Sequence, residues 1–438
     1  MRKGWWPTKD EYDPKLTKDD WLSFISNREL CDEKWLHILA RFYEYGGEGS
    51  CSEVEDFYDE QPKSFNIYMQ FLAKKLIDTG HCVVMSGYDE RNRYWPIPFI
   101  GRYPHKDESG SFIWKLRNEL YDALEEFDIV SWDQEYLLRI LVKQYKELIS
   151  KTNNTEFIDE ELYKWQFITD NQNASPLNII DYLIKNNMNI YDRVRDSQSW
   201  KTLIKNNPKG LEKVINNLKN ENTSLHKRLS DFKIEMKALF DGYSFNSFAN
   251  DERTAACFLS CWYPQKYTLY KDTDLYEPLC LFLGIKKKSA GSKYEHFLDL
   301  VGQIADIIKN DVDLQNIFSA KTGGLVQSDL LIAQTIIWCV FEQRGQELLF
   351  GKTRNYWSGG VVWGSDNKRQ EFIDNGYWQI GWKDKNASNG AKQAWSNIEK
   401  VKIGDYLAFH SYGGQNDLTI HYLSEVTGKD AEKGIPFG

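Results

Sequence analysis

The fold class of the C-terminal part of this chain depends on the stretch YWSGGVVWG at residues 356–364. GYWQIGW follows at 376–382 and VKIGDYLAFHS at 401–411. Glycines beside these tryptophans have no side chain to cover the ring. An uncovered flat ring can stack a planar ligand, such as a base lifted out of nucleic acid. The alternative is a small β-barrel whose core happens to use tryptophan. The four tryptophans concerned are Trp357, Trp363, Trp378 and Trp382.

In this order, the stretches resemble the EVE and YTH-like domains of the PUA superfamily, which are small barrels that bind modified nucleobases. The resemblance rests on YWSGG at 356–360, NGYW at 375–378, KIGDY at 402–406 and HYLSEV at 421–426. It implies a small C-terminal β-barrel over residues 350–438. The family barrel usually has further strand where this chain stops. We therefore expect either a barrel that closes differently or a chain that is a fragment of a longer protein.

The resemblance also implies a cage for a flipped base, with Trp378 as its foremost wall. Extruding a base costs a few kcal/mol, and each aromatic–base stack contributes about 1–3 kcal/mol. We expect Trp378→Ala to abolish binding with little loss of fold. The expected base-binding residues are Trp357, Ser358, Trp363, Trp378, Trp382 and Ser411. The expected phosphate contacts are Lys352, Arg354, Lys368, Arg369 and Lys383.

Composition limits the class of protein. With 438 residues the chain is long enough for two to four domains, and its net charge of −9 argues against a generally basic nucleic-acid binder. Any nucleic-acid contact must come from a local patch or from base stacking. Seven cysteines without a CxxC pair or signal peptide predict reduced thiols and a cytoplasmic location. No run of 18 apolar residues is present, so we expect no membrane contact.

The N-terminal residues 1–130 have the element order of a winged-helix-like domain, with three short helices followed by a β-hairpin. A first helical pattern covers 19–45 and the third helix covers 65–78. A DNA-binding winged helix and a protein-binding one both fit. In the first case the third helix would present Lys63, Ser64, Asn66, Gln70, Lys74 and Lys75, and the wing would present Arg91, Asn92 and Arg93.

Residues 131–250 are polar and asparagine-rich, which predicts a helical connector. Within it, apolar residues repeat every seven positions from Leu211 to Leu239, with Asn222 at one a position. The repeat fits an oligomerising coiled coil or one long helix packed on its own domain. Poor helix formers at 220–224 favour the second interpretation. Residues 251–345 are richer in apolar side chains and predict a compact α-rich unit.

No sequence motif assigns a catalytic residue. The segment from Gly345 to Thr353 approaches a phosphate-binding loop but has five residues between its glycines instead of four. The seven histidines are isolated from one another and form no metal-ligand pair. The enzyme question stays open, although we expect no catalysis from this chain. We also expect no metal and no cofactor.

The whole order resembles the N-terminal specificity region of McrB-like proteins from modification-dependent restriction systems. The segments 99–120 and 261–267 add to that resemblance. It implies a multidomain α+β chain that reads a modified base in DNA for phage defence (type IV restriction). An AAA+ GTPase domain would lie beyond residue 438 or on a partner, and a separate nuclease subunit would cut. The alternatives are an RNA-binding PUA-like module and a non-catalytic protein-interaction scaffold.

Overall fold

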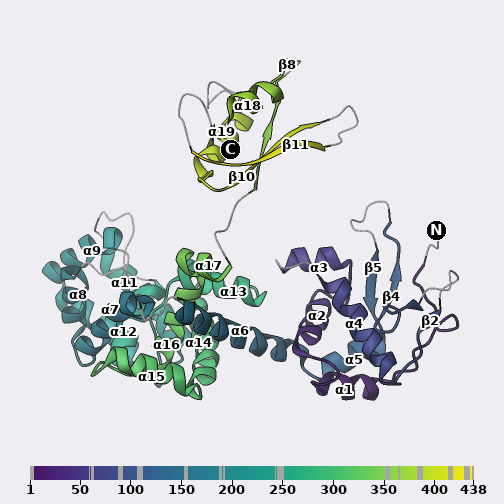
Figure 1. Cartoon of the computed structure of the whole chain (residues 1–438). Coiled ribbons are helices and arrows are strands. Elements are labelled where there is room, and N and C mark those ends of the chain that lie inside the picture. Colours follow the sequence, from purple (N-terminus) through teal and green to yellow (C-terminus); the bar gives the residue numbers. More distant parts are fainter. Residues whose placement is uncertain are drawn as a thin grey trace. The chain divides into compact units, whose positions relative to one another are not determined.

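The computed structural model has mixed α and β structure, with mostly helices and small sheets (Figure 1). The structure divides into two compact units, Met1–Gly345 and Gln346–Gly438. The first unit holds the residues for which three domains were predicted. The residues that the structure describes are 4–58, 60, 64–86, 92–105, 112–151, 156–186, 190, 193–241, 243, 251–350, 356–363, 366–381, 388–412, 418–428 and 435–436.

The first unit opens with four helices, α1 (Lys18–Ser26), α2 (Glu33–Glu44), α3 (Cys51–Phe57) and α4 (Phe65–Asp78). The bounds of α4 are those predicted, but the helical pattern over 19–45 is divided into α1 and α2. The division arises because Asn27 adopts extended backbone at the end of α1 and Asp32 caps α2. Ser50 caps α3 in a reciprocal capping box with Glu53, which satisfies backbone donors at the helix start.

A small antiparallel sheet accompanies these helices, with strand order β1-β5-β4. Its strands are β1 (Glu48–Gly49), β4 (Phe99–Arg102) and β5 (Ile113–Leu116), and a hairpin of β2 (Met85–Ser86) and β3 (Asn92–Arg93) precedes β4. Because β1 lies between α2 and α3, the chain from α2 onward runs helix, strand, helix, helix and then four strands in two antiparallel pairs. Trp6 exchanges two backbone hydrogen bonds with Gly101, at 2.8 and 2.7 Å, so the N-terminal segment lies along β4. The helix α5 (Asn118–Glu126) packs on α1.

The rest of the first unit is helical. Its apolar faces bury large aromatic side chains, among them Trp165, Trp200, Tyr276 and Tyr294. The helices are α6 (Ile129–Lys151), α7 (Glu156–Asn171), α8 (Pro176–Lys185), α9 (Arg193–Asn206), α10 (Pro208–Asn216), α11 (Leu225–Phe240), α12 (Glu252–Trp262), α13 (Glu277–Leu283), α14 (Lys293–Lys309), α15 (Val312–Thr322) and α16 (Asp329–Phe341). The next helix, α17 (Gln343–Phe350), contains the division between the two units. A 3₁₀ turn, η1 (Asn217–Lys219), follows α10, and a π-helical turn, η2 (Asp272–Tyr276), precedes α13.

The heptad pattern over 211–239 does not form one helix. The chain leaves helical geometry after η1, and α11 begins only where Ser224 accepts the N–H of Lys227. Asn220 stabilises the break, because its side chain bonds the hydroxyl of Thr223 and the backbone of Asn222. Three apolar members of the repeat are nevertheless buried, Leu211, Leu218 and Phe232, and Leu225 and Leu239 are partly buried. Both the coiled coil and the single long helix are therefore wrong, although packing within the same unit is observed.

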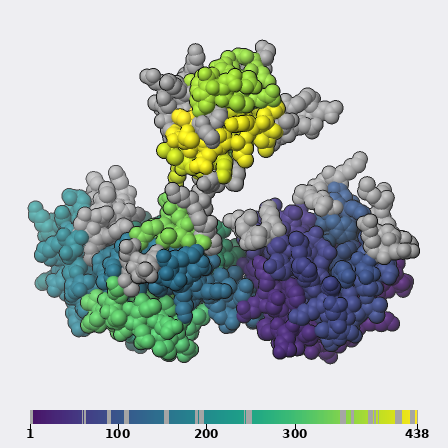
Figure 2. Space-filling model, in the orientation of Figure 1, coloured from purple at the N-terminus to yellow at the C-terminus, as the bar shows by residue number. Residues whose placement is uncertain are grey.

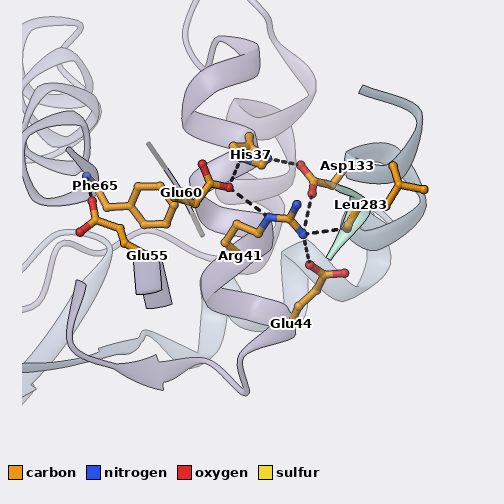
Figure 3. Close-up of polar contacts among 8 residues, drawn as sticks. All are labelled: His37, Arg41, Glu44, Glu55, Glu60, Phe65, Asp133 and Leu283. Atoms are coloured by element: carbon orange, nitrogen blue, oxygen red, sulfur yellow. Dashed lines mark hydrogen bonds and ion pairs between the residues drawn. The ribbon is translucent and has the colours of Figure 1, made fainter. Parts of the chain in front are cut away.

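A buried charge cluster connects α2 with α6 (Figure 3). His37 places Nδ1 2.6 Å from Asp133 and Nε2 2.8 Å from Glu60. Carboxylates only accept hydrogen bonds, so both ring nitrogens donate and the ring is a cation. Burial alone would lower the pKa of His37, but the bonds to Asp133 and Glu60 outweigh it and raise that pKa above 6.5. Arg41 adds a second cation, 3.4 Å from Asp133 and 2.9 Å from Glu44.

Arg41 also connects this cluster to α13. Its guanidinium donates to the carbonyl of Leu283 at 3.3 Å and lies 4.4 Å from the ring centre of Tyr58. Gly284 follows with a φ of +73°, and a Cβ there would come within 2.8 Å of Tyr58 and 2.9 Å of the guanidinium. Because His37 is bonded at both nitrogens and 4% exposed, we interpret the cluster as a structural joint and not as a proton-transfer site.

The second unit contains the aromatic stretches. Its strands are β6 (Tyr356–Gly360), β7 (Val362–Trp363), β8 (Asp366–Asn367), β9 (Tyr377–Trp378), β10 (Tyr406–Tyr412), β11 (Leu418–Glu425) and β12 (Ile435–Pro436), with helices α18 (Arg369–Asn375) and α19 (Asn389–Lys400). β10 pairs antiparallel with β11 and parallel with β6. β9 pairs with β12 and β7 with β8. In Figures 1 and 2 these segments are green to yellow.

The predicted closed barrel is not formed by the described strands of this unit. They make an open three-stranded sheet of order β11-β10-β6 and two separate two-stranded pairs. Since β6 and β10 run parallel, the chain between them must cross over, here through α18, β9 and α19, and β6 and β11 stay on opposite edges. Phe372 of α18 covers the sheet by contacting Phe409 of β10, with ring centres 6.2 Å apart. Leu407, Val426 and Ile435 complete the core.

Candidate nucleic-acid interface

The glycine after Ser358 clears space for one of the protein's own rings. A Cβ on Gly359 would meet the indole of Trp378 at 2.5 Å, so the ring of Trp378 lies directly over this strand. Its Nε1–H donates to the carbonyl of Gly360 at 3.2 Å. Trp378 is 9% exposed and belongs to the core of the second unit. In this conformation it supports the sheet and presents no open face for stacking.

Trp357 is held at the opposite end of β6. Its indole N–H donates to Oδ2 of Asp405 at 2.7 Å, and the same oxygen accepts the backbone N–H of Lys402 at 2.8 Å. Asp405 is 2% exposed and follows Gly404, whose φ is +91°. The short KIGDY segment is thus a tight turn whose buried carboxylate fixes an indole. Trp357 is partly buried against the same core, so both described rings are structural here.

A polar cluster lies at the other end of the sheet, where β6 and β10 finish. The hydroxyl of Ser411 is 2.6 Å from Nε2 of His421, and Nη1 of Arg369 is 3.2 Å from Nδ1 of the same ring. Arginine only donates, so Nδ1 must accept and the ring is neutral with its proton on Nε2. Nε2–H then donates to Ser411. Two predicted site residues, Ser411 and Arg369, therefore meet through a histidine that the sequence interpretation had left aside.

This cluster is next to the edge of the core. Gly360, which accepts from Trp378, pairs in register with His410 of β10, and the N–H of Val361 donates to the carbonyl of His410 at 3.1 Å. Burial lowers the pKa of His410, and the nearby His421 lowers it further. Two imidazoles, a hydroxyl and a guanidinium can together donate to and accept from the edge of a planar polar ligand.

The remaining predicted residues divide into three groups. Ser358 is exposed and pairs with Ala408. Lys368 forms ion pairs with Asp366 at 3.0 Å and Glu371 at 2.9 Å, and these carboxylates compensate its charge. By contrast, no carboxylate among the described residues lies within ion-pair distance of Arg369. Outside the described residues lie Trp382, Lys352, Arg354, Lys383 and the side chain of Trp363.

The predicted recognition helix of the first unit has a mixed surface. Asn66, Gln70 and Lys74 are exposed on α4, but Ile67 and Phe71 lie among them and are each 56% exposed. Two of the other predicted contacts are turned toward their own domain. Lys75 donates to the carbonyl of Glu29 and lies 5.1 Å from the ring centre of Trp35, while Arg93 lies 5.4 Å from that of Trp6. Lys63 and Arg91 lie outside the described residues.

Comparisons with known proteins add no relative. The chain matches no protein-family model, no curated protein and no solved structure. The resemblance to EVE-like and McrB-like proteins thus rests on the sequence motifs. Within the described ranges, no three or more His, Cys, Asp or Glu side chains are grouped to hold a metal ion. No helix in the part of the chain that the structure describes is long and apolar enough to cross a membrane.

Proposed function

We propose that this chain is a DNA-binding specificity module that reads a modified base, as part of a modification-dependent restriction system. The observation that carries the proposal is the meeting of Ser411, His421 and Arg369 at one end of the β6–β10 sheet. The motif resemblance supports it independently, because the sequence alone places Ser411 and Arg369 among the expected site residues. The winged-helix-like order from α2 to α4, with β1 between α2 and α3, is also consistent with DNA binding.

The three side chains would divide the work of recognition. Ser411 and His421 offer a hydroxyl and an imidazole to the edge of a flipped base, and Arg369 offers a charge to a flanking phosphate. Trp378 would support the site indirectly. Its ring packs over Gly359 and its N–H donates to the carbonyl of Gly360, which fixes the backbone beside the polar cluster. Stacking on Trp378 itself would require that ring to leave the core. The proposed recognition of the base therefore depends mainly on polar contacts, whereas the sequence predicted an aromatic cage.

The test is a fluorescence-anisotropy titration at stated salt with three otherwise identical duplexes: unmodified, with N6-methyladenine and with 5-methylcytosine. We expect a preference for one modified duplex that Ser411→Ala reduces. Arg369→Gln should weaken binding to all three and reduce the salt slope by about one. Lys400→Gln, an exposed cation on α19, is the matched control and should change nothing.

Three outcomes would overturn the proposal in different ways. Tighter binding to single-stranded RNA than to any duplex, with the same loss in Ser411→Ala, would establish an RNA-binding module. No binding to any nucleic acid, together with self-association that depends on concentration, would establish a protein-interaction scaffold. Equal binding to all three duplexes that neither substitution affects would remove the polar cluster from the site.

A further inference from the structure

A second candidate site is a small cavity among the helices of the first unit, between α7, α16 and the segment that leads into η2. The cavity has a volume of about 20 Å³, and its lining includes Glu161, Lys164, Lys271, Gln334 and Trp338. A cavity of this size admits one ligand of the size of a water molecule or a halide ion, and no organic molecule. All five residues belong to the first unit, so the site shares none with the interface proposed above.

The helix α16 brings a polar side chain into an apolar interior. Every residue from Leu331 to Ile337 is buried, and Gln334 lies in the middle of this run with an exposure of 0%. Trp338 follows one turn later on the same face of the helix. Neither the amide oxygen nor the amide nitrogen of Gln334 has a hydrogen-bond partner among the described residues. A buried amide without partners destabilises a fold, and a ligand that bonds to it removes that cost.

Two lysines place their ammonium groups beside the same indole. The Nζ atoms of Lys164 and Lys271 lie 5.5 and 5.4 Å from the ring centre of Trp338. Lys164 is 5% exposed, and the side chain of Lys271 is 12% exposed. Both cations have therefore lost most of their contact with water, and hydrogen-bond acceptors must replace it.

The protein satisfies each ammonium group only in part. Lys164 donates to Glu161, and Lys271 donates to Asp274 at 3.1 Å. These carboxylates are the only hydrogen-bond acceptors of the two ammonium groups among the described residues. A lysine ammonium carries three N–H donors, so each group retains donors without an acceptor. Because the carboxylates balance the two charges, the cavity offers an excess of N–H donors and not an excess of charge.

The pKa of Lys271 agrees with a cation that the protein stabilises incompletely. Burial lowers this pKa, and the neighbouring Arg253 and Lys164 lower it further, by more than the bond to Asp274 raises it. An anion in the cavity would oppose these effects. A halide ion accepts hydrogen bonds from several donors at once and donates none, whereas a water molecule must also place its own hydrogens among these donors.

We propose that this cavity binds a single halide ion, such as chloride, between the ammonium groups of Lys164 and Lys271 and the amide of Gln334. The ion would accept from both lysines and from the amide nitrogen. It would thereby connect α7, the segment before η2 and α16, so that chloride stabilises the helical part of the first unit. The inference does not depend on the function proposed for the second unit.

Thermal melting of the full chain in sodium chloride and in sodium gluconate at equal ionic strength tests the proposal. Gluconate is too large for a cavity of about 20 Å³. We expect a higher melting temperature in chloride, by an amount that grows with the logarithm of the chloride concentration, because a ligand that binds only the folded chain stabilises it by mass action. Bromide should act as chloride does. Broadening of the chloride NMR line by the full chain measures the binding directly.

Gln334→Leu is the sharpest variant, because it keeps a similar side-chain volume and removes the amide. In gluconate it should be at least as stable as the natural chain, since an apolar side chain replaces polar atoms without partners. In chloride it should lose the additional stabilisation. Lys271→Gln should weaken chloride binding about tenfold. Lys321→Gln, which removes an ion-paired lysine outside the cavity, is the matched control and should keep the full chloride effect.

The proposal is overturned if the natural chain melts at the same temperature in chloride and in gluconate, in which case the cavity holds water only. It is also overturned if Gln334→Leu and Lys271→Gln retain the full chloride effect, which would assign that effect to the protein surface. Ser411→Ala and Arg369→Gln should both keep the chloride effect. A failure of nucleic-acid binding in the second unit would therefore leave this inference standing, and the reverse also holds.

Discussion

The two tryptophan-rich regions of this protein use glycine in the same way and reach opposite results. In the first unit, Phe112 lies over Gly101, and a Cβ there would approach the ring to 2.2 Å. In the second, Trp378 lies over Gly359 with the corresponding approach at 2.5 Å. The ring over Gly101 is at the rim of a cavity of about 180 Å³, whereas Trp378 is 9% exposed in a core.

The difference shows that glycine beside an aromatic residue indicates close approach of a ring to the backbone, but not whose ring it is. A flat side chain of the protein and a flat ligand place the same steric demand on the strand. What separates them is the packing on the outer face of the ring. Phe372, Leu407 and Ile435 belong to the core that buries Trp378. The rings beside Gly101 continue to Tyr103, which faces solvent.

The largest effect is expected from removing the buried ring. Trp378→Ala should destabilise the second unit by about 3–5 kcal/mol, the usual cost of deleting a large core aromatic. This corrects the earlier expectation that the substitution would spare the fold. Urea unfolding followed by circular dichroism measures the loss, with Trp378→Phe as the milder variant that keeps a ring but loses the bond to Gly360. A Trp378→Ala protein as stable as the natural one would show that the ring is not a core element.

The next effect concerns the carboxylate that holds the other indole. Asp405→Ala would leave the N–H groups of Trp357 and Lys402 without this acceptor. A fully buried donor left unsatisfied costs about 1–3 kcal/mol, and because these two bonds are part-buried we expect a loss at the lower end of that range. Asp405→Asn retains a carbonyl oxygen and should lose less. Thermal melting of both variants checks the order, and equal stability of the two would contradict a hydrogen-bonding role for this side chain.

A matched pair of glycine substitutions addresses the comparison directly. Gly359→Ala should cost about 1–3 kcal/mol, because Trp378 is enclosed and cannot move aside without disturbing the core. Gly101→Ala should cost less, since Phe112 is partly exposed and can rotate toward solvent. Denaturant midpoints for the two variants, measured under identical conditions, compare them. A larger loss for Gly101→Ala would reverse the assignment of open and closed rings.

The smallest expected effect is a difference in pH dependence between the units. The pKa of His37 is raised, so its contribution to stability is present below about pH 6.5 and is lost as the pH rises through the raised value. The pKa of His410 is lowered, so its contribution is present above 6.5 and is lost as the pH falls. Calorimetric melts at pH 6 and pH 8 should show opposite shifts of the two transitions. His37→Gln and His410→Gln should each flatten one of them.

Much of the local structure could be predicted from sequence pattern. The bounds of α4 and the turn before β10 follow from apolar spacing and a Gly-Asp pair, whereas the sequence left Ser50 and Ser52 as equal candidates for the cap of α3, which the structure gives to Ser50. The heptad repeat led to a wrong prediction of one continuous helix. Apolar periodicity indicates which residues face a core, and it does not indicate whether the helix between them is continuous. Asn220 and its neighbours interrupt the helix, while Leu218 before the break and Leu229 and Phe232 after it are buried.

The candidate site was only partly predictable. Ser411 and Arg369 were chosen for residue type and proximity to the motif, and they do converge. His421, which joins them, was set aside as an isolated histidine. Its pairing depends on the register of β10 with β11, which shifts between Phe409 and His410. Pattern alone does not specify such a shift, because a bulge changes which residues face each other without changing the alternation elsewhere.

Local interactions therefore suffice for the helices, caps and turns of this chain, because each depends on residues a few positions apart. The open sheet, the enclosure of Trp378 and the cavity beside Trp6 depend on contacts between segments far apart in sequence. Trp6 contacts Gly101, and the ring of Trp378 lies over Gly359, because the tertiary fold brings these separate segments together. Whether an aromatic ring fills a core or borders a cavity is then determined by what covers its outer face, and that is a property of tertiary packing.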